Sequence, residues 1–258
     1  MPAITVGRAR VEYRAEGTGQ GLVLLHGTGP GSSMWDGLVG EFSDRNTVIL
    51  PDVAGSEKAE DDGGDLTVEA LAAQVAAVIE DSGAAPVDLL GFSLGAPIAA
   101  AVAATRPELV RRLVLAAGWS HLDDEYLRTM MTVWREIADN PPAFGRFATL
   151  TAFSGAFLNS IGREAVEQNA AYMRPTPGVL RQLDLNLRLD VRELLPLVRA
   201  ETLVIGCTRD ATVPVENARG LHAAIAGSAY AEIDCGHVAP IEKPAEFVTL
   251  VADFVRRP

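Results

Sequence analysis

Four apolar runs in the first half of the chain are bounded by turn residues, a pattern typical of buried parallel strands. They cover residues 22–25, 47–50, 87–90 and 113–116. Between the second and third runs, apolar residues recur at helical spacing, with Thr67 as the expected N-cap and Gly83 near the end. Strands that alternate with helices predict an α/β fold with a doubly wound, mostly parallel sheet.

The two ends of the chain extend this pattern. Residues 4–13 alternate around Gly7 and predict an antiparallel hairpin at the sheet edge. Later in the chain, strands are expected at 202–205 and 230–233, and helices at 215–226 and 245–256. The pattern therefore predicts one α/β core domain made of residues 1–118 and 191–258.

Residues 119–190 interrupt the alternation, and they predict a helical insertion that would form a cap subdomain. The insertion holds 8 of the chain's 15 aromatic residues. Two interpretations stay open, an ordinary helical core and the roof of an apolar ligand cavity. The candidates for lining such a cavity are Trp119, Trp134, Phe144, Phe147, Phe153 and Phe157.

The amino-acid composition limits the classes of molecule that this protein is expected to bind. The net charge of −12 and pI near 4.8 disfavour nucleic acid and anionic membranes, which would repel this surface. No leader pattern and no apolar run of about 20 residues is present, so we expect a cytoplasmic protein without a membrane partner. Cys207 and Cys235 match no metal motif, and we expect buried free thiols. The predicted partner is a small-molecule substrate, and the predicted assembly is a monomer or homodimer.

One serine lies where nucleophiles are found in a known turn. Residues 89–97 read LLGFSLGAP, so Ser93 is flanked by Gly91 and Gly95 between a predicted strand and a predicted helix at 94–105. A sharp turn at that place projects the hydroxyl outward, and the glycines let strand and helix pass closely. The context predicts a nucleophile, with a structural turn serine as the alternative.

A serine hydroxyl needs a base near neutral pH, and the chain has four histidines. His222 falls in a predicted helix, His121 begins the insertion, and His26 precedes Gly27, where it would brace the turn. His237, in a loop between the last predicted strand and the last helix, is the candidate base.

The acid that orients this base should follow another strand. Asp210 follows the strand at 202–205 and precedes a helix that Pro214 opens. A helix-capping role is its alternative. The fallback acids are Asp123, Asp124 and Asp234.

These residues carry a resemblance to the α/β-hydrolase superfamily, in which the triad runs serine, acid, histidine along the chain, as Ser93, Asp210 and His237 do here. The resemblance covers essentially the whole chain. It implies an eight-stranded sheet with a helical cap and no metal or organic cofactor. Serine at the turn argues against the superfamily's epoxide hydrolases and haloalkane dehalogenases, which use aspartate there.

The resemblance also assigns an oxyanion hole, formed by the backbone amides of Thr28 and Leu94. Thr28 lies in the motif LLHGTGPGS, in which Gly27 and Gly29 would let the chain approach the substrate. Phosphate binding is the rival interpretation of this glycine-rich loop. The lysine and hydroxyl residue of a P-loop are missing, and no G-x-G-x-x-G is present.

The segments HGTGPGSSMW, PDVAGSEKAE and CGHVAPIEKPAEF resemble meta-cleavage product hydrolases, enol-lactonases and small esterases. Carbon–carbon hydrolases of that group commonly carry tryptophan where this chain has Val238 and asparagine where it has Phe92. Both residues are pocket candidates, and Phe92 also resembles cofactor-free perhydrolases. We therefore expect hydrolysis of a carboxylic ester or lactone.

Two alternatives stay open beside ester hydrolysis. One is carbon–carbon bond hydrolysis of the meta-cleavage type. For Arg188, near the end of the insertion, we expect a side chain that faces solvent, with contact to a substrate carboxylate as the alternative. The other is a small-molecule receptor that keeps the triad and turns over slowly.

Overall fold

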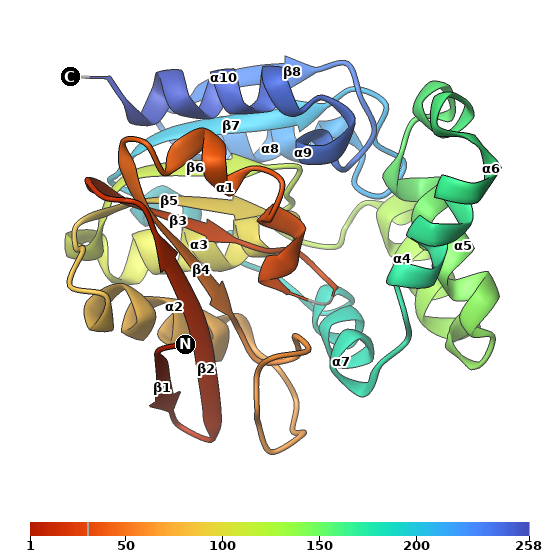
Figure 1. The fold of residues 1–258 in the computed structure, drawn as a ribbon, viewed down its shortest axis with the longest axis horizontal. Helices are drawn as coiled ribbons and strands as arrows, with labels where there is room; N and C mark the ends of the chain where they lie inside the picture. Colours follow the sequence, from red (N-terminus) through yellow and green to blue (C-terminus); the bar gives the residue numbers. More distant parts are fainter. Residues whose placement is uncertain (30, 258) are drawn as a thin grey trace.

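An eight-stranded sheet forms the centre of the protein (Figure 1). The structure is a computed structural model that describes residues 1–29 and 31–257, so Pro30 of the glycine-rich motif and Pro258 lie outside the described residues. The strands are β1 (Ala3–Val6), β2 (Ala9–Glu16), β3 (Gln20–Leu25), β4 (Asn46–Asp52), β5 (Val87–Phe92), β6 (Val110–Ala116), β7 (Glu201–Cys207) and β8 (Ala229–Ile233).

The strand order is β1-β2-β4-β3-β5-β6-β7-β8. Strands β1 and β2 form the predicted antiparallel edge hairpin, and β2 joins β4 antiparallel. From β4 to β8 every neighbouring pair is parallel. The predicted fold class, a mostly parallel α/β-hydrolase sheet, is confirmed.

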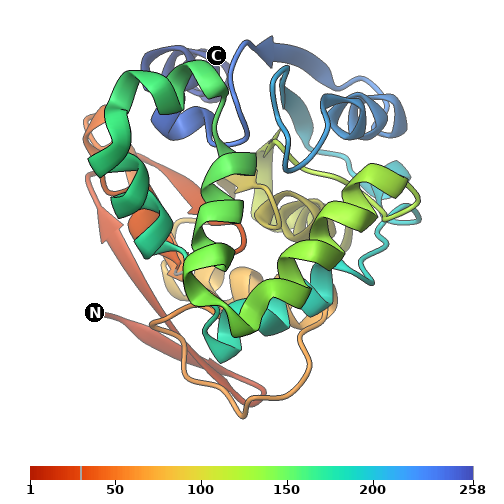
Figure 2. The same ribbon diagram turned by 90° about the vertical axis from the view of Figure 1, so that its right-hand side faces the viewer.

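Helices lie against both faces of the sheet and at its carboxyl edge (Figure 1, Figure 2). They are α1 (Val39–Phe42), α2 (Val68–Asp81), α3 (Gly95–Thr105), α4 (Glu125–Glu136), α5 (Pro141–Ala152), α6 (Gly155–Tyr172), α7 (Pro177–Asn186), α8 (Val215–Ala224), α9 (Ala239–Glu242) and α10 (Pro244–Val255). Within the described residues, no helix is both long enough and apolar enough to cross a membrane.

Two hydrophobic clusters lie on opposite faces of the sheet. Side chains of α2, α3 and α8 belong to one cluster, and those of α1 and α10 to the other. Successive residues of β3 alternate between them, since Val23 and Leu25 join the first while Leu22 and Leu24 join the second. Burial on both faces explains the unbroken apolar runs in the sequence.

Helices α4 to α7 lie between β6 and β7 in the chain. In Figure 2 these green and teal helices stand in front of the carboxyl ends of the central strands. Residues 119–190, all of which the structure describes, contain no regular strand, and a single bridge joins His121 to Asp190 where the segment leaves and returns. This helical segment therefore covers the edge of the sheet at which the predicted site residues lie.

A glycine fixes how closely α3 approaches β3. A Cβ on Gly95 would lie 2.6 Å from the carbonyl oxygen of His26 and 2.7 Å from that of Leu25. Gly220 lies in α8 with no atom within 4 Å of the same position. The two glycines are both helical but differ in the space around them.

We therefore expect opposite effects from the same substitution. Gly95→Ala should lower the free energy of unfolding by about 1–3 kcal/mol, because backbone carbonyls must move to admit the methyl group. Gly220→Ala should raise it by about 0.5–1 kcal/mol through helix propensity. Urea denaturation of both variants measures this, and a stabilised Gly95→Ala variant would contradict the packing argument.

Candidate active site

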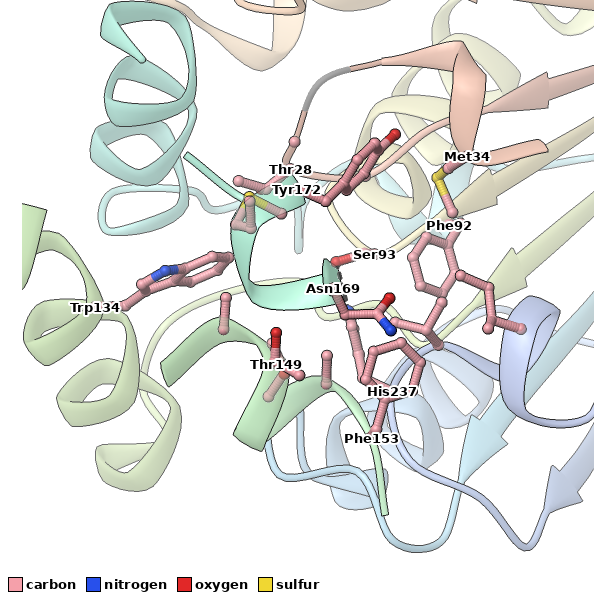
Figure 3. A pocket seen from close by; sticks show the side chains of 18 of the residues that line it. Thr28, Met34, Phe92, Ser93, Trp134, Thr149, Phe153, Asn169, Tyr172 and His237 are labelled. Atoms are coloured by element: carbon pink, nitrogen blue, oxygen red, sulfur yellow. Dashed lines mark hydrogen bonds between the residues drawn. The ribbon is translucent and has the colours of Figure 1, made fainter. Parts of the chain in front are cut away.

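Ser93 occupies the sharp turn between β5 and α3. Its φ of 55° is unusual for a residue with a side chain, and its amide donates a 2.9 Å hydrogen bond to the carbonyl of Ala116 on β6. A non-glycine residue held in this conformation is a form of backbone strain that recurs at functional sites. The turn directs the hydroxyl into the cavity seen in Figure 3.

Ser93, His237 and Asp210 form one hydrogen-bonded chain. The distance from Ser93 Oγ to His237 Nε2 is 2.9 Å, and that from His237 Nδ1 to Asp210 Oδ2 is 2.6 Å (Figure 3 shows the first bond). The side chains of His237 and Asp210 are 7% and 1% exposed. Three residues that are far apart in the sequence thus meet in the geometry that activates a serine.

The turn after β7 fixes the carboxylate of Asp210. Its Oδ1 accepts hydrogen bonds from the backbone amides of Thr212 at 2.8 Å and Val213 at 2.7 Å. These bonds leave Oδ2 to accept from His237 Nδ1–H. In that tautomer Nε2 carries a lone pair toward Ser93, as a general base requires.

The fallback acids have other partners. Asp234 forms an ion pair with Arg209 on the surface, and Asp123 pairs with Arg192. Asp124 is the N-cap of α4, where its side chain accepts from the amide of Leu127. None of these three carboxylates bonds to His237 in the described structure.

The loop after β3, which carries Thr28, passes beside the turn that carries Ser93 and Leu94. A Cβ on Gly27 would lie 2.7 Å from Cβ of Ser93, so glycine lets this loop pass directly beside the serine. Within the described residues, neither the Thr28 nor the Leu94 amide has a recorded hydrogen-bond acceptor in the protein. Two unpaired amides next to the serine are suited to stabilising an oxyanion.

His26 supports this loop, as the sequence suggested. Its Nδ1–H donates to the carbonyl of Gly27 at 2.8 Å, and the side chain is fully enclosed. Burial lowers the pKa of His26, which outweighs the opposing effects of that carbonyl and of Asp52. The enclosed imidazole braces the loop, and its ring bonds to Gly27 rather than to Ser93.

A largely apolar cavity opens above Ser93. It contains about 860 Å³ of space, including its opening to solvent. Figure 3 shows Trp134 on one side of Ser93 and Phe92 with Met34 on the other. The charged side chains Arg, Lys, Asp and Glu are missing from its described lining, whose polar members include Thr28, Asn169 and Asn186.

The structure places six pocket candidates in the cavity lining, namely Gly27, Gly29, Phe92, Trp134, Phe153 and Val238. The other four candidates are corrected by it, because they lie outside the lining. Trp119 and Phe144 are completely buried in the hydrophobic core. Phe144 packs against Trp134, with 5.5 Å between the ring centroids. Phe147 packs against that core. Phe157 stacks on Phe153, with 5.1 Å between the ring centroids, but does not itself line the cavity.

Arg188 does not reach the cavity. Its guanidinium donates to the carbonyl of Leu66 at 2.6 Å and to that of Asp184 at 3.2 Å. The side chain is exposed, as expected, and the alternative contact with a substrate carboxylate in the cavity is wrong.

Sequence reasoning missed several residues that line the cavity, among them Met34, Met131, Asn169, Tyr172, Met173 and Asn186. Aromatic enrichment pointed to the right segment but could not tell which face of each helix points inward. Methionine and asparagine carry no such compositional signal. The only usable hint was the polar pair Gln182 and Asn186, four residues apart on an otherwise apolar helical face.

The helical segment is also bonded to the loop that carries His237. The amide of Val238 donates to the carbonyl of Ala152 at 3.1 Å. Glu242 accepts from the amide of Gly236 at 3.1 Å and from that of Ser154 at 3.0 Å. The end of α5 and the start of α6 are thus joined to the histidine loop.

No metal site accompanies the triad in the part of the chain that the structure describes, where no group of three potential ligands is found. Cys207 and Cys235 are buried and free, as expected. The thiol of Cys207 lies 3.9 Å from the carbonyl of His237, and its pKa is raised by its hydrogen bond to Cys235 and by burial. These thiols are packing groups beneath the histidine loop.

Comparison with known proteins agrees with this geometry. A pyrrolizixenacetamide deacetylase from Xenorhabdus hominickii is 38% identical, over 99% of this chain and 98% of the relative. A 2-hydroxy-6-oxo-2,4-heptadienoate hydrolase from Pseudomonas putida is 28% identical, over 98% and 95%. An enol-lactonase structure from Burkholderia xenovorans superposes with a TM-score of 0.88 at 22% identity, covering 99% of this chain and all of that one.

A family model described as the alpha/beta hydrolase family matches residues 22–250. That range includes the loop of Thr28, the serine turn, the helical segment and the loops of Asp210 and His237. Sequence, fold and site geometry converge, and the chain belongs to the alpha/beta hydrolase family.

Proposed function

We propose that this protein is a serine hydrolase that cleaves an uncharged carboxylic ester or lactone of moderate size through an acyl-enzyme. The observation that carries the proposal is the hydrogen-bonded chain from Ser93 through His237 to Asp210 at the base of an apolar cavity. The helical segment 119–190 acts as a cap on the core formed by residues 1–118 and 191–258.

The reaction proceeds in two halves. Ser93 Oγ attacks the carbonyl carbon while its proton passes to His237 Nε2, and the amides of Thr28 and Leu94 receive the negative charge on the carbonyl oxygen. The intermediate collapses as the leaving group takes that proton. Water then attacks the acyl-enzyme with His237 again as base, releasing the acid and restoring Ser93. Asp210 holds the imidazole in place and stabilises the imidazolium.

The chemistry of the cavity supports an uncharged substrate. A carboxylate buried there would meet no arginine or lysine among the described lining residues, and the protein's net charge of −12 adds repulsion at longer range. The Pseudomonas putida relative is named for a heptadienoate, which is an anion. The lining therefore favours ester or lactone hydrolysis over the cleavage of such acids.

A pair of matched esters tests this proposal. We expect 4-nitrophenyl butyrate and methyl 4-nitrophenyl glutarate to be hydrolysed, and the anionic mono-4-nitrophenyl glutarate to have a kcat/KM at least about 100-fold lower. The methyl ester has the same chain and leaving group as the anion, so the two differ in charge and in one methyl group. Equal kcat/KM for the anion and its methyl ester would overturn the uncharged-substrate proposal.

Hydrolysis of an acetamide is a second candidate, favoured by the name of the relative that is 38% identical. The same triad and oxyanion donors serve amide cleavage, in which His237 protonates the leaving nitrogen. Comparing 4-nitrophenyl acetate with 4-nitroacetanilide separates the two. Measurable Ser93-dependent turnover of the anilide would move amides ahead of esters as the substrate class.

A further inference from the structure

The loop that carries Thr28 receives two hydrogen bonds from a single helix of the cap. Gln182 Oε1 accepts from the amide of Gly29 at 2.8 Å, and Asn186 Nδ2 donates to Thr28 Oγ1 at 2.9 Å. Both polar residues lie on α7, four positions apart and hence on one face. They are 1% and 0% exposed, so water does not replace these bonds in the folded protein.

This loop lies beyond the hydrogen-bond ladder of the sheet, because β3 ends at Leu25. On its far side, Asp52 accepts from the amide of Ser32 at 2.7 Å and from its hydroxyl at 2.8 Å. Closer to β3, Asn186 bonds to the side chain of Thr28, and Gln182 bonds to the backbone amide of the next residue, Gly29. The core therefore fixes the loop at Ser32, and α7 fixes it at Thr28 and Gly29.

The helix that makes these bonds is itself fixed to the core. The backbone of Gly178 passes so close to that of Gly55 that a Cβ would lie 2.9 Å from its carbonyl carbon. Arg181 forms a 2.9 Å ion pair with Asp61, and Arg188 donates to the carbonyl of Leu66. The loop 55–66 therefore sets the position of α7, and α7 sets the position of Thr28 and Gly29.

An oxyanion donor lowers the barrier only when its N–H already points to where charge develops. A displacement of about 1 Å at a catalytic group can cost about 100-fold in rate. We propose that Gln182 and Asn186 are positioning residues that hold the Thr28 amide in the oxyanion geometry. This inference rests on the proposed function, since it requires that the amide stabilise an oxyanion.

Gln182→Met tests the proposal, because it keeps the length of the side chain and removes the acceptor of the Gly29 amide. Gln74→Met is a matched control. Gln74 is also a buried glutamine whose Oε1 accepts a 2.8 Å hydrogen bond from a loop amide, that of Ala54, but it lies on α2 and bonds to neither Thr28 nor Gly29. Because Ala54 precedes the Gly55 on which α7 packs, this variant also controls for an indirect effect through loop 55–66. Both variants leave one buried amide unpaired and should lose similar stability.

Two readouts separate positioning from general destabilisation. The first is kcat against KM for 4-nitrophenyl butyrate, with active sites counted by fluorophosphonate titration. The second is the affinity for an alkyl trifluoromethyl ketone. Ser93 Oγ adds to the carbonyl carbon of this inhibitor, the serine proton passes to His237, and the negative charge stays on the former carbonyl oxygen.

For Gln182→Met we expect kcat to fall about 10- to 100-fold with KM within about twofold, and inhibitor affinity to fall in the same proportion. Gln74→Met should keep both values within about threefold of wild type. A Gln182→Met enzyme that matches Gln74→Met in stability, kcat and inhibitor affinity would overturn the inference.

Asn186→Ala provides a second test if Gln182→Met does not fold, since it removes the bond to Thr28 Oγ1 and leaves Gln182 in place. We expect a loss of inhibitor affinity and of kcat of about 3- to 10-fold. Unchanged affinity and kcat would overturn the inference. A wild-type protein that neither reacts with fluorophosphonate nor hydrolyses the ester would instead overturn the proposed function itself, and the positioning role with it.

Discussion

Replacing Ser93 by alanine is expected to lower kcat for ester hydrolysis by about 10⁴- to 10⁶-fold while the protein stays folded. Among the described residues the hydroxyl bonds to His237 alone, and its backbone amide, which alanine retains, holds the turn through Ala116. The change therefore removes the nucleophile and leaves the turn between β5 and α3 intact. Brief exposure to a fluorophosphonate, followed by intact-protein mass measurement, should give one adduct in wild type and none in Ser93→Ala.

The chain offers a matched control in Ser120. That serine is also buried, and its Oγ lies 2.8 Å from His121 Nδ1, while His121 Nε2 lies 3.7 Å from Asp123. It has the same three residue types but lies outside the described lining of the cavity, in the longer connection between β6 and α4. Ser120→Ala should keep the adduct and kcat within about threefold. An adduct that survives in Ser93→Ala and disappears in Ser120→Ala would show that Ser120, and not Ser93, is the nucleophile.

Asp210→Asn is expected to lower kcat by about 10⁴-fold, a larger loss than its similar shape suggests. The asparagine Oδ1 can still accept from the amides of Thr212 and Val213, so its Nδ2 faces His237 Nδ1. That donor selects the tautomer in which Nε2 carries the proton. The imidazole then has no lone pair to offer Ser93, and it loses the charge that stabilises its cationic form.

The other strand-end carboxylate supplies the control for this change. Asp234 follows β8 and forms an exposed ion pair with Arg209, so Asp234→Asn should leave kcat within about twofold. Steady-state kinetics on an activated ester, with circular dichroism to verify folding, compares the two substitutions. Retention of more than a tenth of wild-type kcat in Asp210→Asn would contradict the assignment of Asp210.

The core of the fold was predictable because its signals are local. The run at 22–25 is apolar at every position since its residues face two hydrophobic clusters in turn, and Thr67 caps α2 by accepting from Ala70, as its position before the periodic segment indicates. The strands extend beyond the apolar runs, for example to Asp52, because ladder bonds continue where the side chains become polar.

The candidate triad was predictable for a related reason: each member lies in the turn or loop that follows a strand, and parallel strands end at one edge of the sheet. The cap was not predictable at this level. Trp119 and Trp134 are indistinguishable in composition, yet one is enclosed in the core and the other borders the cavity. That difference depends on how α4, α5 and α7 rotate against the core, which only their packing decides.

The hydrogen bonds between the helical segment and the catalytic loops limit how this protein can be recombined with its relatives. An exchange of residues 119–190 as one block would replace Gln182, which meets the amide of Gly29, and Ser154, which shares Glu242 with the histidine loop. Chimaeras with new specificity are better spliced after α6, so that α7 stays with its own core. The linker between Tyr172 and Pro177 is then the suitable place for the junction. A grafted segment must also retain the hydrogen bond from Ser154 to Glu242.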